Sequence, residues 1–163
     1  MLYQQDDKGL KLRTAAAQAS CSSIVSILSS VNGKKALELI NEKGPSTGKT
    51  ALHRALEGLV KYCTTELSVI DMMCSDMELS PEQILMVNYY LAVHLLLNFK
   101  PDLNTPDKTW KTANSLLNTL PNATKSTFDN VPEPIRAVID SMYMTAIVHH
   151  DFHNQLKFIV LNF

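Results

Sequence analysis

Cysteine is scarce in this sequence, and its arrangement fits neither of its two common structural uses. Cys21, Cys63 and Cys74 are an odd number, and no pair has the C-x-x-C or C-x-x-H spacing of a zinc site. We therefore expect neither a disulfide framework nor a structural metal, and no cofactor of another kind is indicated. Free cysteines of this kind are typical of the reducing cytoplasm, which is the location that the sequence predicts.

Excess charge and long hydrophobic runs are missing as well. The formal net charge is −1 and the isoelectric point is about 6.5, so no global basic field would attract nucleic acid or anionic lipid. The longest apolar stretch, residues 84–99, is too short and too polar to span a bilayer. The first residues, MLYQQDDKG, are acidic and polar, unlike a secretory signal. We expect a cytoplasmic protein with neither nucleic acid nor membrane as its partner.

No run of alternating β-type residues occurs, and the apolar residues instead recur at helical spacing. The 163 residues suit one all-α domain. The strongest helix start is Ser80-Pro81-Glu82-Gln83, which reads as a serine cap, a proline in the first turn and the glutamine of a capping box. Residues 100–108 and 122–134 read as loops. Helices are expected at 14–31 (interrupted near 20–23), 34–42, 50 to about 73, 81 to about 99, 112–120 and from 134 onward.

The segment GPSTGKT, residues 44–50, looks like the phosphate-binding loop of a nucleotide hydrolase. That loop needs four residues between its glycines, because the backbone N–H groups must curl around the phosphates, and here only three separate Gly44 from Gly48. It must also follow a buried strand, whereas the preceding segment KKALELINEK reads as a charged helix. The sequence therefore disfavours an NTPase, and no catalytic or metal-binding residue follows from this motif.

Read from Gly48, the string GKTALHRA resembles the opening of an ankyrin repeat, G-x-T-[PA]-L-H-x-A. The resemblance implies a role for each residue. Gly48 permits the tight turn, Thr50 starts the first helix and its hydroxyl pairs with His53, and Leu52 and Ala55 face the interior.

Further matches extend the resemblance to about residues 8–120. Downstream, residues 93–97 match the apolar second helix, and Asp102, Asn104 and Asp107 match the loop pattern D-x-N-x-x-D. Lys111-Thr112-Ala113 matches the next repeat start, although Trp110 stands where glycine is expected and Asn114 where leucine is expected. Successive starts lie farther apart than the family period of about 33 residues. The resemblance therefore implies divergent repeats with a helical insertion at about 60–90, followed over 121–163 by a loop and a C-terminal capping helix.

An ankyrin-like solenoid implies protein binding rather than catalysis, because its first helices and loop tips form an extended surface. The contact candidates are the variable positions beside the motif. Among them Trp110 ranks first, because tryptophan is enriched at binding hot spots and cannot serve a turn that requires glycine. Burial of Trp110 beneath the inserted helices is an equally good alternative. The candidates are Thr47, Lys49 and Arg54 in one unit and Lys108, Trp110 and Lys111 in the next.

An all-α metal-dependent hydrolase is the alternative function. His149, His150 and Asp151 form a cluster near the C-terminus, and His149 and His153 have the i, i+4 spacing that can bind a metal on a helix. A polar helix face is the simpler interpretation, because the further metal ligands of HD-type phosphohydrolases are not found. Lysine-rich, arginine-poor divergent repeats also resemble those of intracellular bacterial proteins that act inside host cells. This suggests an effector in the host cytoplasm, or an accessory domain of a larger protein.

Overall fold

The computed structural model describes residues 7–63, 69–73 and 78–148, and within these ranges all regular structure is helical. The prediction of an all-α protein is confirmed. None of the helices in the described ranges is long and apolar enough to cross a membrane. The helices are α1 (Lys8–Ala17), α2 (Cys21–Ser29), α3 (Gly33–Asn41), α4 (Ala51–Tyr62), α5 (Val69–Met73), α6 (Pro81–Leu97), α7 (Ala113–Leu117), α8 (Asn122–Asp129) and α9 (Glu133–Val148).

Local hydrogen bonds determine where the best-defined helices begin. At α6 the Ser80 hydroxyl accepts from the Gln83 backbone N–H, and the Gln83 side chain accepts from the Ser80 N–H, with Pro81 as the first helical residue. Thr50 at α4 and Thr112 at α7 make the same reciprocal capping box. The start predicted for α6 is therefore confirmed, because a capping box involves only residues three apart.

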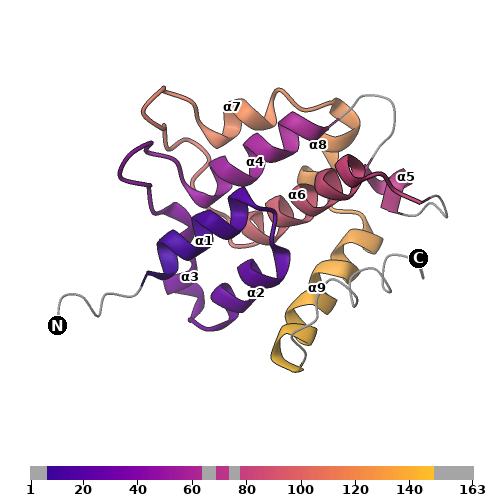
Figure 1. Ribbon diagram of the computed structural model, residues 1–163, viewed down its shortest axis with the longest axis horizontal. Coiled ribbons are helices and arrows are strands. Elements are labelled where there is room, and N and C mark those ends of the chain that lie inside the picture. Colours follow the sequence, from indigo (N-terminus) through magenta and orange to yellow (C-terminus); the bar gives the residue numbers. More distant parts are fainter. Residues whose placement is uncertain (1–6, 64–68, 74–77, 149–163) are drawn as a thin grey trace.

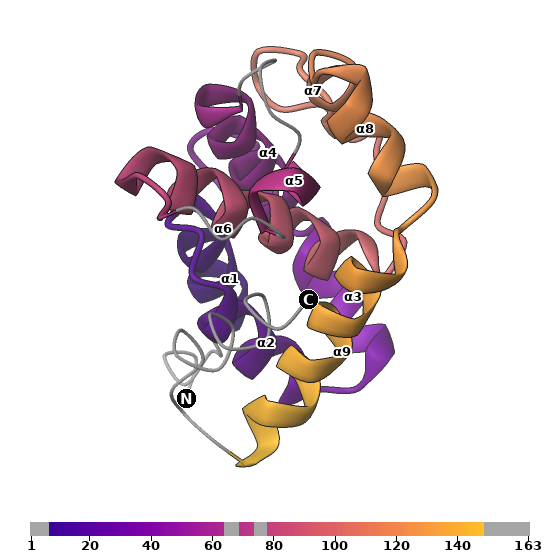
Figure 2. The same ribbon diagram turned by 90° about the vertical axis from the view of Figure 1, so that its right-hand side faces the viewer.

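The helices stack in two layers. In one layer α4 packs between α1 and α7, so that these three helices lie one above the other (Figure 1). In the other layer α6 packs against α4 and α2, and α9 packs against α2 and α6 (Figure 2). Gly58 allows α4 to pack closely against α6, because a Cβ atom there would overlap the ring of Tyr89 on α6. The core between the layers is continuous and mainly aliphatic.

The helices differ from the predictions in several places, and the first helix begins at Lys8 rather than at residue 14. The break between the first two helices lies at residues 18–20, where Ala19 has a left-handed φ of 55°, rather than near 20–23. The helix expected from residue 50 to about 73 ends at Tyr62, because Cys63 adopts an extended backbone with φ −71° and ψ 132°. The polar segment 122–134, expected to be a loop, contains α8.

Tertiary contacts explain why α8 forms from a polar segment. The Tyr90 hydroxyl on α6 donates to Thr127 Oγ1 over 2.7 Å. The Phe128 ring lies 5.2 Å from the ring of Tyr90 and 4.5 Å from that of His94, measured between centroids. Thr124 and Thr127 of α8 are themselves buried. These partners come from a helix distant in the chain, so the local pattern of residues 122–129 carries little of this signal.

Candidate binding surface

Two loops that lie far apart in the sequence, residues 44–49 before α4 and residues 107–111 before α7, are joined directly. The backbone N–H of Lys108 donates to the Thr47 carbonyl over 3.0 Å. Gly48 has a φ of 72°, and a Cβ atom there would lie 3.0 Å from the Lys108 nitrogen and 3.3 Å from the Asp107 Cα. The sequence interpretation that Gly48 permits a tight turn therefore agrees with the geometry, and the contact between the loops is a second reason for glycine.

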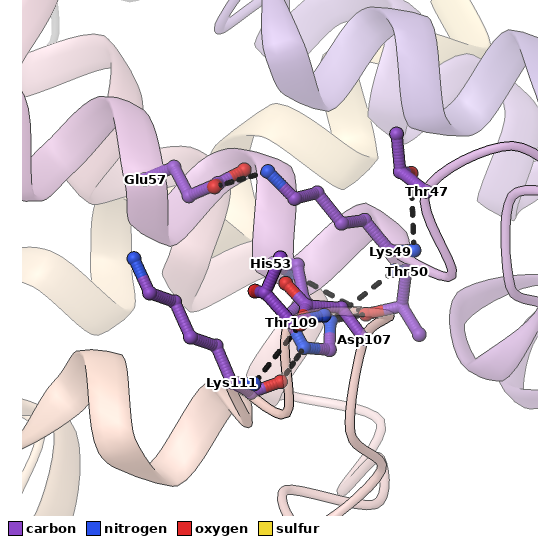
Figure 3. A network of polar contacts seen from close by, with 8 residues as sticks. All are labelled: Thr47, Lys49, Thr50, His53, Glu57, Asp107, Thr109 and Lys111. Carbon is purple, nitrogen blue, oxygen red and sulfur yellow. Dashed lines mark hydrogen bonds and ion pairs between the residues drawn. The ribbon is translucent and has the colours of Figure 1, made fainter.

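His53 links the start of α4 to the second loop (Figure 3). Its Nδ1 accepts from the Thr50 N–H over 3.2 Å and lies 2.8 Å from the Thr50 hydroxyl. Because Nδ1 is an acceptor, the ring hydrogen resides on Nε2, which donates to the Lys111 carbonyl over 2.9 Å. The side chain is 1% exposed. The pairing predicted between Thr50 and His53 is present, and the bond to Lys111 is an addition that the sequence did not suggest.

Asp107 stabilises the conformation of the second loop through hydrogen bonds. Its Oδ1 accepts from the N–H groups of Thr109 and Lys111, at 2.8 and 2.9 Å, and from the Thr109 hydroxyl at 2.7 Å. The Asp107 N–H donates to the Lys111 carbonyl over 2.8 Å. Burial tends to raise the pKa of Asp107, but the hydrogen bonds from Thr109 and Lys111 outweigh it, so the pKa lies below the usual value. The sequence pattern identified Asp107 as a loop residue without indicating this role.

Trp110 occupies the left-handed position of the second loop, as Gly48 does in the first. Its φ is 66°, its N–H donates to the Asp107 carbonyl over 3.0 Å, and its side chain is 83% exposed. The expectation that tryptophan cannot serve this turn is therefore wrong, and so is the alternative that it is buried under inserted helices. A left-handed backbone costs an L-residue about 1–2 kcal/mol, so the fold accommodates a strained turn that leaves a tryptophan in solvent.

Thr47, Lys49 and Arg54 line one groove of about 430 Å³ between α1 and the loop 44–49. The Lys49 ammonium is 2.6 Å from a carboxylate oxygen of Glu57 on α4 (Figure 3). Arg13 of α1, which sequence reasoning missed, lies on the opposite wall and pairs with Glu42 over 3.0 Å. No local motif marks Arg13, because its position in the groove depends on the packing of α1 against α4.

Lys108 and Lys111 lie on the neighbouring loop rather than in this groove. The Lys108 ammonium donates to the Pro45 carbonyl of the first loop over 2.9 Å, and the Lys111 side chain is exposed. Three of the six candidate residues therefore line the groove, and the other three lie on the adjoining loop 107–111, where Lys108 contacts the loop 44–49. The structural motif residues Gly48, Thr50, Leu52, His53 and Ala55 are buried.

Within the described residues, no group of three or more His, Cys, Asp or Glu side chains could hold a metal ion. The cluster of His149, His150 and Asp151 lies outside the described residues, as does His153. Burial lowers the pKa of His94 to about 3, so the ring is neutral, and it packs against the rings of Tyr90 and Phe128. His94 therefore serves as a core residue of the α6–α8 contact.

Comparison of the chain with protein-family models, curated proteins and solved structures finds no match. The surface formed by the two loops and the groove must therefore be interpreted from its own geometry and chemistry.

Proposed function

We propose that this chain is a protein-binding module built from three divergent ankyrin-like helix pairs, α1–α2, α4–α6 and α7–α8. The first helices of these pairs are the stacked helices α1, α4 and α7. The expected insertion at about 60–90 would then include α5 and the first half of α6. The C-terminal helix α9, expected as a cap over the last unit, packs against α2 and α6. We place the module in the cytoplasm, or in a host cytoplasm if the protein is an effector.

The link between successive units supports the repeat interpretation. Thr50 and Thr112 both cap a first helix through a reciprocal capping box, and a left-handed residue stands two positions before each of them, Gly48 and Trp110. His53 of one unit donates to the backbone of the next at Lys111. In a solenoid each unit contacts only its neighbours, and such a bond between adjacent starts is the interaction that this architecture needs.

Exposure of Trp110 is the observation that carries the proposed function. A tryptophan that is 83% exposed at a loop tip forgoes the free energy of burial, and the loop also bears a left-handed backbone at that residue. Neither feature stabilises the isolated fold. Both are accounted for if a partner buries the indole, since tryptophan dominates the free energy of many protein interfaces.

Trp110 also provides the experiment, because it is the only tryptophan in the chain. The tagged protein would be used to capture partners from a cell extract, with quantitative mass spectrometry comparing wild type and Trp110→Gly. A captured protein would then be purified and titrated against the wild type while tryptophan emission is recorded, with a partner form free of tryptophan. We expect the variant to lose that protein and the wild-type emission to shift to shorter wavelength as the indole leaves water.

The control is Lys125→Ala, which changes a partly exposed lysine on α8, outside the loop 107–111. Equal capture by wild type and Trp110→Gly, with no emission shift on binding, would refute the role of Trp110 and with it the proposed surface.

A further inference from the structure

The groove between α1 and the loop 44–49 is unusually cationic for a protein of net charge −1. Arg13, Lys49 and Arg54 line it, and the Lys108 ammonium lies against its wall through the bond to Pro45. Two carboxylates, Glu42 and Glu57, pair with Arg13 and Lys49. The groove therefore keeps a local excess of positive charge although the chain as a whole has none.

We propose that this groove binds an acidic, extended peptide segment of the partner protein, whose Asp or Glu carboxylates pair with Arg54 and Arg13. The inference rests on the proposed function and specifies the chemistry of the partner. An arginine can hold a carboxylate through two parallel N–H···O bonds, which gives both free energy and orientation.

The N–H donors that Arg13 and Arg54 leave unused among the described residues support this assignment. Arg54 forms no side-chain hydrogen bond or ion pair with any residue that the structure describes, although it is only partly exposed. The Arg13 side chain is 12% exposed, and its single hydrogen bond within the described residues goes to Glu42. A guanidinium has five N–H donors, so both side chains retain donors for an incoming acceptor. Desolvated donors of this kind gain most from a charged acceptor.

The shape and the apolar parts of the groove favour a peptide over a small ion. Its volume, about 430 Å³, falls within the range of roughly 300–1,000 Å³ that is typical of ligand pockets. Leu10, Ala17 and Pro45 also line it, and Leu10 is 56% exposed. A segment that alternates carboxylates with an apolar side chain would fill both parts. Because the net charge is −1, no broad basic field would recruit a nucleic acid to the same place.

The test uses the full chain and defined probes. One probe is a capped peptide of five glutamates and one leucine, and its matched control replaces each glutamate by glutamine. Inorganic phosphate is the third probe. Binding would be measured by isothermal titration calorimetry at low and at moderate salt, and mapped by amide chemical shifts. We expect the acidic peptide to bind, the glutamine peptide to bind at least tenfold more weakly, and the affinity to fall as salt rises.

Arg54→Gln is the main variant, and Arg136→Gln is its matched control because Arg136 is an exposed arginine on α9, outside the groove. We expect Arg54→Gln to weaken the acidic peptide at least tenfold with an unchanged melting temperature, and Arg136→Gln to leave both unchanged. Arg13→Gln should weaken binding too; its melting temperature must be checked because the side chain is mostly buried.

Three results would overturn the inference: no binding of the acidic peptide, equal binding by wild type and Arg54→Gln, or phosphate binding as tightly as the peptide. If capture of a partner depends on Trp110 but the acidic peptide does not bind the groove, only the inference about the groove fails. If the groove binds the peptide but capture of the partner is unchanged in Trp110→Gly, the proposed role of Trp110 fails and the inference about the groove is retained.

Discussion

Replacing His53 by alanine removes the side chain that joins the α4 cap to the loop 107–111. Two losses follow from the geometry. The buried Thr50 N–H loses its acceptor, which costs about 1–3 kcal/mol, and the bond from Nε2 to the Lys111 carbonyl is lost, which costs about 0.5–1.5 kcal/mol. The Lys111 carbonyl is not orphaned, because it still accepts from the Asp107 N–H. We expect His53→Ala to lower the free energy of unfolding by about 2–4 kcal/mol.

His53→Gln separates the two losses. Glutamine fills the corresponding position of the α6 capping box, where the Gln83 side chain accepts from the Ser80 N–H over 2.8 Å. A glutamine at position 53 should therefore keep the cap and lose only the bond to Lys111. We expect a loss of about 1 kcal/mol for this variant. Ser115→Ala is the matched control, because it removes the same kind of cap side chain at α7, where the groups are exposed and water can replace it.

The assay is urea unfolding followed by circular dichroism at 222 nm, with the slope compared between variants so that stability is not confused with a change in the unfolded state. A domain of this size has a total stability of about 5–15 kcal/mol, so His53→Ala should remain folded in water. If its free energy of unfolding lies within about 0.5 kcal/mol of wild type, a spread usual for surface substitutions, the hydrogen-bond network does not hold the two loops and the reasoning is refuted. If His53→Gln is as unstable as His53→Ala, the bond between the loops, rather than the cap, is the dominant contribution.

Four further substitutions test other parts of the structure. Trp110→Gly should raise the free energy of unfolding by about 1 kcal/mol, because glycine adopts a φ of 66° without strain. Gly48→Ala should lower the free energy of unfolding by at least about 1 kcal/mol. If urea unfolding shows that both variants change stability in the same direction, the reasoning is contradicted. Burial lowers the pKa of His94 from its usual 6.5 to about 3, so the unfolded chain binds the extra proton between these values. Stability should then fall as pH decreases through this window, by at most about 1.4 kcal/mol per pH unit from this residue, and His94→Leu should flatten that slope in urea titrations at pH 4–7. Tyr90→Phe removes the bond to α8 and should cost about 1 kcal/mol by thermal unfolding; no change would show that this bond does not stabilise α8.

Features that depend on residues three or four apart were predictable from the sequence. The capping boxes at Ser80 and at Thr50 are of this kind, as is the helical spacing of the apolar residues. The turn at Gly48 was expected from the resemblance to the start of an ankyrin repeat, and Gly48 has a left-handed φ of 72°. Local hydrogen bonds and helical periodicity are encoded within a few residues, so no knowledge of the fold is needed to recognise them.

Features that depend on distant partners were not predictable. α8 forms from a polar segment because Tyr90 and His94 of α6 contact it. α4 ends at Tyr62, although neither proline nor glycine follows directly to predict this end. The sequence determined by itself the helical class, the best helix starts and the motif that includes His53. Only the tertiary structure decided that His53 reaches Lys111, that Trp110 remains in solvent in a left-handed turn, and that Arg13 and Arg54 face one groove. The reason is physical: a cap is completed within one turn of helix, whereas a groove or a bond between loops exists only when helices far apart in the chain pack together.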